Sequence, residues 1–187
     1  MKNLKVQFKL IIYLFLFLNV SNIILAKNSD KLFDSNNISN YFSGILSTND
    51  NQYEKSYSHL KLLNNLEDSH YTYSQYYQYS LVALNRFKDA NNYSKKLEDK
   101  KLDNFESNLI SSIYHLKKKD FKKASFYSRK LINKNQPGTV QNLVSVSLGS
   151  WIGFQDITNL NLALDVLNII PEQFKNIKDI QKTFAYC

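Results

Sequence analysis

A short pattern recurs three times in the sequence without a gap, at a constant interval of 34 residues. The copies are NQYEKSYSHLKLL from Asn51, NRFKDANNYSKKL from Asn85 and KDFKKASFYSRKL from Lys119. Each contains an aromatic residue, a small residue three positions later and a leucine ten positions after the aromatic one: Tyr53, Ser56 and Leu63; Phe87, Ala90 and Leu97; Phe121, Ala124 and Leu131. This spacing lies on one face of an α-helix, so we expect a helix in each copy, with its small residue at a close contact with another helix.

The recurrence resembles the tetratricopeptide repeat (TPR) family, whose unit is a 34-residue helix–turn–helix with a small residue in its second helix. The resemblance covers about residues 39–136. The family also has a small residue in the first helix, nine positions before the aromatic one, where this sequence has Gly44, Gln78 and Ser112. The remaining consensus residues of the family are poorly kept. The resemblance implies an all-α fold, a TPR-like α-solenoid of helix–turn–helix hairpins.

Composition and local signals also favour helices. The 187 residues include four Gly and two Pro, whereas a sandwich or barrel of short strands needs many more turn residues. The segment Asp103-Asn104-Phe105-Glu106 is typical of a capping box that opens a helix. In this interpretation the Asp103 side chain accepts a backbone N–H and the Glu106 side chain reaches back.

The first 26 residues are typical of a leader. Lys2, Lys5 and Lys9 precede nine consecutive apolar residues, and the segment ends at the small residue Ala26. This pattern predicts a signal peptide that is cleaved after Ala26, and therefore an exported, periplasmic protein. The alternative is an uncleaved N-terminal anchor, which would associate the chain with the inner membrane, facing the periplasm. The apolar stretch is short for a bilayer span and polar residues interrupt it, which favours cleavage.

After the leader, the sequence predicts a polar linker, three 34-residue units, a fourth irregular helical hairpin and a terminal helix, over residues 27–38, 39–136, 137–171 and 172–187 respectively. In the fourth hairpin, Pro137-Gly138 breaks the chain, Thr139 caps the next helix and Ala163 takes the small-residue position. The terminal helix either caps the array or begins a further unit, because the longer exported proteobacterial repeat proteins that the chain resembles continue beyond such a helix.

Residues that commonly perform catalysis or bind metal are sparse and far apart. His59, His70 and His115 have no metal-binding spacing, and Cys187 is the only cysteine. No glycine-rich phosphate loop and no nucleophile with a recognisable base is present. We therefore expect a protein that is not an enzyme and that uses no metal and no cofactor. His115 falls in a first-helix core position, which favours a buried, hydrogen-bonded imidazole over a ligand.

Nucleic-acid binding is the alternative function. Positive charge concentrates on the third unit, at Lys117, Lys118, Lys119, Lys122, Lys123, Arg129, Lys130 and Lys134. The segment HYTYSQYYQY from His70 adds tyrosines that could stack on bases. Helical spacing instead favours packing for several of these rings and a solvated face for the lysines. The formal net charge is +8, and it falls to +5 without the three lysines of the leader.

The TPR resemblance implies a scaffold for protein–protein interaction whose first helices bind a peptide or a partner helix. The ligand-facing positions of the family correspond here to Tyr41, Ile45, Gln75, Tyr79, Val82, Leu109, Ile113 and Leu116. These residues predict an apolar and aromatic groove, and the alternative is that later helices bury them as core. The positions of the family's carboxylate clamp hold no Lys or Arg, which disfavours a partner bound by its C-terminal carboxylate. The pattern does not identify the partner.

Overall fold

A computed structural model of the chain describes residues 34–63, 66–134, 139–154, 164–165, 167–168 and 170–186. Within these ranges the chain forms helices and turns and no strand, so the predicted all-α class is confirmed. The predicted leader, most of the predicted linker, Pro137-Gly138 and Ala163 lie outside the described residues. The chain divides between Leu66 and Glu67 into two compact units, which are described separately.

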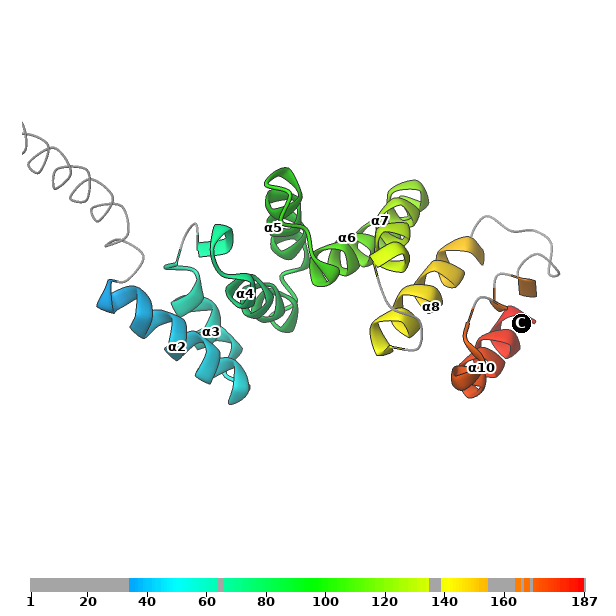
Figure 1. Cartoon of the computed structure of the whole chain (residues 1–187), viewed down its shortest axis with the longest axis horizontal. Helices are drawn as coiled ribbons and strands as arrows, with labels where there is room; N and C mark the ends of the chain where they lie inside the picture. Colours follow the sequence, from blue (N-terminus) through cyan, green and yellow to red (C-terminus); the bar gives the residue numbers. More distant parts are fainter. Residues whose placement is uncertain are drawn as a thin grey trace, which may run out of the picture. The chain divides into compact units, whose positions relative to one another are not determined.

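The first unit contains helices α2 (Ser35–Asn49) and α3 (Tyr53–Leu60), which pack against each other (Figure 1). The Asp34 side chain caps α2 by accepting a hydrogen bond from the Asn36 N–H. The prediction of a linker through residue 38 is therefore wrong for its last four residues, because Asp34 is a good N-cap and starts the helix earlier. Helix α3 ends before Leu63, ahead of two asparagines, which are poor helix formers.

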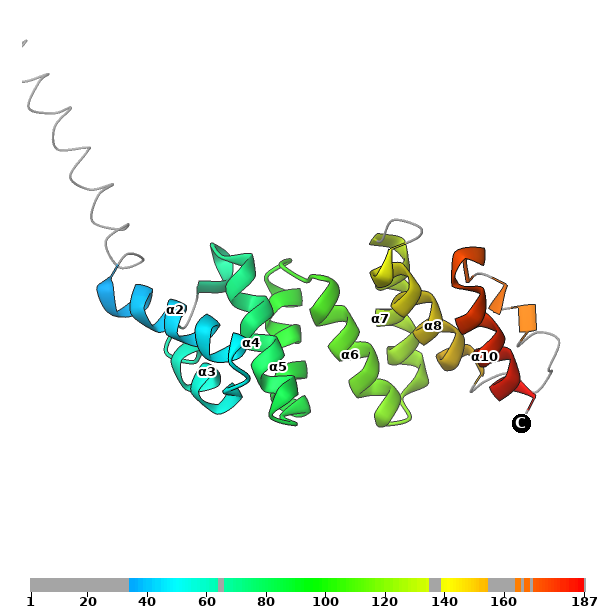
Figure 2. The ribbon, with the colours of Figure 1, turned by 90° about the horizontal axis from the view of Figure 1, so that it is seen from below.

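The second unit begins with the 3₁₀ turn η1 (Leu66–Asp68), which starts at the last residue of the first unit. Its helices are α4 (Tyr71–Ala83), α5 (Phe87–Asp99), α6 (Phe105–Lys117), α7 (Phe121–Lys134), α8 (Val140–Phe154) and α10 (Lys175–Ala185). Helices α4 to α8 pack in chain order, each against the next, as Figure 2 shows. None of the helices within the described ranges combines the length and apolar character that crossing a bilayer requires.

The turns inside three helix pairs have the same backbone geometry. Asn51, Asn85 and Lys119 adopt left-handed φ angles of 58°, 58° and 59°. Each donates its N–H to the carbonyl three residues earlier, and the next residue donates to the carbonyl five residues earlier. This is a Schellman motif, which satisfies carbonyls that the end of a helix leaves open. The following helix starts two residues later, at Tyr53, Phe87 and Phe121, where the sequence pattern begins its aromatic position.

The small residues of the sequence pattern lie where helices come closest. Ser56, Ala90 and Ala124 are fully buried. The Ser112 hydroxyl donates a hydrogen bond to the Ala124 carbonyl at 2.9 Å, which joins α6 directly to the backbone of α7. In the first unit, a Cβ atom added to Gly44 would lie 2.6 Å from the Leu60 side chain. The predicted close contacts are therefore confirmed, in the first helices as well as in the second.

The predicted capping signals are confirmed at one place and shifted at another. Thr139 caps α8 as expected, since its Oγ1 accepts a hydrogen bond from the Asn142 N–H at 3.1 Å. At α6 the predicted Asp103–Glu106 box is wrong by one residue. Asn104 is the N-cap, and its side chain and backbone exchange hydrogen bonds with Ser107 at 2.8 Å each.

The C-terminal part of the unit is built around Val146, Leu167 and Ile170, against which Phe174 and Ala185 pack. The predicted terminal helix starts later than expected, because the 3₁₀ turn η2 (Glu172–Phe174) follows Pro171 and α10 begins at Lys175. Ile180, Phe184 and Tyr186 of α10 are exposed. Helix α10 therefore covers part of α8 without burying its own apolar side.

A buried ion pair joins η1 to α5. The Glu67 carboxylate is almost completely buried and contacts the Nζ atoms of Lys96 and Lys100 at 2.5 and 2.9 Å. Burial by itself raises the pKa of Glu67, but hydrogen bonds from Lys96 and Lys100 outweigh burial and hold this pKa below its ordinary value of 4.5. The folded state therefore favours the ionised form more than the unfolded chain does.

We expect stability to fall as the pH drops below about 4.5 and through the lower folded-state pKa of Glu67, because protonation breaks the pair with the two lysines. The variant Glu67→Gln should flatten this part of a plot of melting temperature against pH. Glu54→Gln is the matched control, since Glu54 is exposed. Equal curves for Glu67→Gln and the native chain would show that the pair contributes nothing.

Replacing either buried alanine by arginine should unfold the second unit. A long charged side chain at Ala90 or Ala124 overpacks the helix contact and buries a charge, which costs several kcal/mol. Circular-dichroism melts of Ala90→Arg and Ala124→Arg test this, with Asn92→Arg on the exposed side of α5 as the control. A melting temperature within a degree or two of the native value for the alanine variants would contradict the packing described above.

Candidate partner-binding surface

The predicted groove residues are distributed over both units. Tyr41 and Ile45 are half-buried on α2 of the first unit. The second unit contains the other six, which are Gln75, Tyr79 and Val82 on α4 and Leu109, Ile113 and Leu116 on α6. None of the eight is buried, and Tyr79 and Ile113 remain 53% and 41% exposed. We call these six residues of the second unit the α4/α6 surface.

Helix α4 turns three of its neighbouring aromatic and polar side chains inward. Tyr73 is 2% exposed, and its ring stacks on Tyr77 with centroids 5.8 Å apart. The Tyr77 ring then meets the edge of Tyr93 of α5 at 4.8 Å, and the Tyr93 hydroxyl lies 3.1 Å from the hydroxyl of Ser74. This cluster confirms that several tyrosines of the Tyr-rich segment are used for packing. It leaves Tyr79 on the outer side of the helix.

Helix α6 buries its small polar side and leaves its apolar side open. Ser107, Asn108, Ser111 and Ser112 are all buried, whereas Leu109, Ile110, Ile113 and Leu116 are half-buried or exposed. A helix of a self-sufficient domain normally shows the reverse arrangement. The requirement for small residues at the contact with α7 explains which side is buried. The apolar side is therefore available to cover something else.

One end of the α4/α6 surface is polar. The Gln75 amide donates a hydrogen bond to Glu106 Oε1 at 2.7 Å, and the Tyr71 hydroxyl donates one to Glu106 Oε2 at 3.2 Å. Burial, together with the charge of Glu106, raises the pKa of Tyr71 to about 12. These bonds hold the first turns of α4 and α6 together. Sequence reasoning missed the role of Tyr71, because no local signal links residues so far apart in the chain.

His115 lies at the C-terminal end of α6, where it packs rather than binds. Its Nδ1 atom is 3.4 Å from Asp120 Oδ2, and its ring stacks on Tyr127 with centroids 5.8 Å apart. Burial lowers the pKa of His115 and outweighs the opposite effect of Asp120. Across the part of the chain that the structure describes, no three His, Cys, Asp or Glu side chains come together as metal ligands would.

Comparison of the chain with protein-family models, with curated proteins and with solved structures finds no match. The resemblance to TPR proteins therefore depends on the sequence pattern alone. What the chain binds has to be argued from its own surfaces.

Tyr73 and Tyr79 provide a matched test of the α4/α6 surface, because they are the same residue type on the same helix. We expect Tyr73→Ala to cost about 3 to 5 kcal/mol of stability, as truncation of a core aromatic does. Tyr79→Ala should cost less than about 1 kcal/mol, because half of its side chain is already in solvent. Circular-dichroism melts of the two variants measure the difference. A comparably large loss for Tyr79→Ala would mean that this surface is core.

Proposed function

We propose that the chain is a TPR-like α-solenoid and acts as a non-enzymatic scaffold for protein–protein interaction in the cell envelope. In this proposal a peptide or a partner helix lies on the α4/α6 surface. The observation that carries the proposal is the inverted burial of α6, where serine and asparagine side chains face inward and Leu109, Ile113 and Leu116 face outward. Exposed apolar side chains that lie together on a surface are typical of an interaction site.

Two observations support a solenoid. The left-handed turn residues Asn51, Asn85 and Lys119 stand 34 positions apart, as do the buried small residues Ser56, Ala90 and Ala124. Helices α4 to α8 contact their neighbours in chain order. Stacking of like helical hairpins in this way is the architecture of repeat proteins.

The spacing of the exposed residues supports an elongated partner. Leu109, Ile113 and Leu116 follow one another at intervals of four and three residues, which forms a straight stripe along α6. Tyr79 of α4 and Ile113 of α6 occupy equivalent positions 34 residues apart and are both exposed. An aromatic anchor beside an aliphatic stripe suits the apolar face of a helix or the side chains of an extended peptide. The Glu106 cluster provides a polar rim at one end.

The location is part of the proposal and depends on residues 1–26. A cleaved leader would release the chain into the periplasm, and an uncleaved one would tether it to the inner membrane. The scaffold requires no metal and no cofactor. For the alternative, nucleic-acid binding, the structure removes Tyr73 and Tyr77 from the candidates for base stacking, because both are used in packing.

Binding of a partner purified with the native chain from an envelope fraction tests the proposal. Tyr79→Ala and Ile113→Ala should each weaken this binding by about 1 to 3 kcal/mol, because each removes an anchor from the α4/α6 surface. Lys101→Ala is the control, since Lys101 is exposed outside this surface. Unchanged affinity in both variants, with helicity intact, would exclude the α4/α6 surface as the site.

A further inference from the structure

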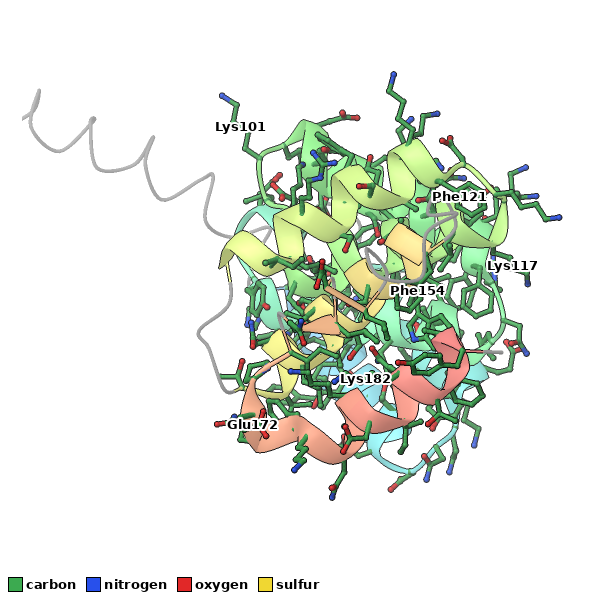
Figure 3. The ribbon with its side chains drawn as sticks, turned by 90° about the vertical axis from the view of Figure 1, so that its right-hand side faces the viewer. Lys101, Lys117, Phe121, Phe154, Glu172 and Lys182 are labelled. Carbon is green, nitrogen blue, oxygen red and sulfur yellow. The ribbon has the colours of Figure 1, made fainter. Side chains whose placement is uncertain are left out.

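A second surface lies on α7 and on the turn that precedes it. It consists of exposed side chains, all positively charged except one: Lys118, Lys119, Lys122, Lys123, Arg129 and Phe126. We call it the α7 basic surface. It shares no residue with the α4/α6 surface. Figure 3 shows Lys117 and Phe121, at the two ends of the turn into α7, close together on one side of the unit, with Lys101 on another.

Most of the charge on the α7 basic surface is uncompensated. Lys123 contacts Asp120 at 3.5 Å. Lys119, Lys122 and Arg129 form no ion pair with any residue of the described ranges, unlike their neighbour Lys130, which lies between Glu98 and Asp103. Like charges this close repel each other, so the surface favours a negatively charged partner.

Phe126 lies in the middle of these charges. It follows Lys122 by four residues and precedes Arg129 by three, so the three side chains share one face of α7. Its side chain is 53% exposed. The same residues line a shallow hollow together with Lys119 and Ser125. An exposed apolar ring surrounded by cations fits a partner that offers both negative charge and apolar material.

We propose that the α7 basic surface binds an anionic lipid bilayer, with the cations on the headgroups and Phe126 inserted between them. Basic residues flanking an aromatic one on a helix face are typical of binding at the membrane interface. The charges run along a straight helix, and a planar surface of opposite sign can meet all of them without a fixed register. A leader or anchor at residues 1–26 would bring the chain to such a membrane.

The environment of Phe126 disfavours nucleic acid at the same surface. The Lys130 ammonium lies 5.0 Å from the centroid of the Phe126 ring, on one of its faces. The Tyr127 ring meets Phe126 edge to face at 5.1 Å. A base would have to stack on what remains of the ring, and no second exposed aromatic belongs to the α7 basic surface as defined. Single-strand binding normally uses several such rings.

Co-sedimentation of the full chain with vesicles tests the proposal. The vesicles are pure phosphatidylcholine or one part phosphatidylglycerol to two parts phosphatidylcholine. We expect tighter binding to the anionic vesicles, weakened by added salt. The triple variant Lys119→Asn, Lys122→Gln, Arg129→Gln should lose about 100-fold of this added affinity, at about fivefold for each cation. Asn is used at position 119 because it tolerates the left-handed backbone there, as Asn51 and Asn85 do.

The matched control is Lys55→Gln, Lys101→Asn, Lys175→Gln, which removes the same charge from exposed positions elsewhere, one of them also left-handed. It should lose less than about threefold, because long-range attraction alone is screened by salt. Phe126→Ala should weaken binding about threefold to tenfold through lost insertion. Binding to pure phosphatidylcholine measures the contribution of residues 1–26, which all variants share.

Equal losses in the triple variant and in its control would overturn the proposal, because net charge alone would then explain the binding. It would also be overturned if a single-stranded oligonucleotide bound more tightly than the anionic vesicles at the same salt concentration and lost its affinity in the triple variant. That result would assign the α7 basic surface to nucleic acid. Melting curves equal to the native chain's confirm that the substitutions leave the fold intact.

Discussion

The close approach of paired helices at positions with little or no side chain is the constraint on which the rest of the structure depends. Gly44 admits Leu60, and Ala124 receives the hydroxyl of Ser112 on its carbonyl oxygen. At such distances a larger side chain has no place. The contact therefore decides which side of each helix faces inward, and the residues on the opposite side follow from it.

This constraint gives the interior an unusual chemistry. Many buried residues are serines, and several bond a carbonyl one turn earlier in their own helix, as Ser94 does with Ala90 and Ser150 with Val146. Such residues are small and satisfy their own hydroxyls, so they suit a tight contact. They bury little apolar area. The larger apolar residues of α6 are left outside, and both proposed interactions draw on side chains that the interior does not need.

The sequence could predict what repeats, and failed where a choice was local or a contact was distant. The 34-residue interval placed the starts of α3, α5 and α7 correctly, because an aromatic residue follows each turn. The cap of α6 was displaced by one residue, since Asp103 and Asn104 are both good caps and only Ser107 distinguishes them. The Tyr71–Glu106 bond has no local signal. The exposure of Ile113 could not be predicted, because periodicity alone does not say which side of a helix is buried.

The serine-rich interior also has a thermal consequence. Exposure of apolar surface raises the heat capacity on unfolding, and exposure of polar surface lowers it. Because residues such as Ser111 and Asn108 become hydrated along with the leucines, the two contributions partly cancel. The stability curve of the folded chain should then be shallow, with little gain or loss over a wide range of temperature. An array held together in this way would keep nearly constant stability in an organism whose surroundings warm and cool.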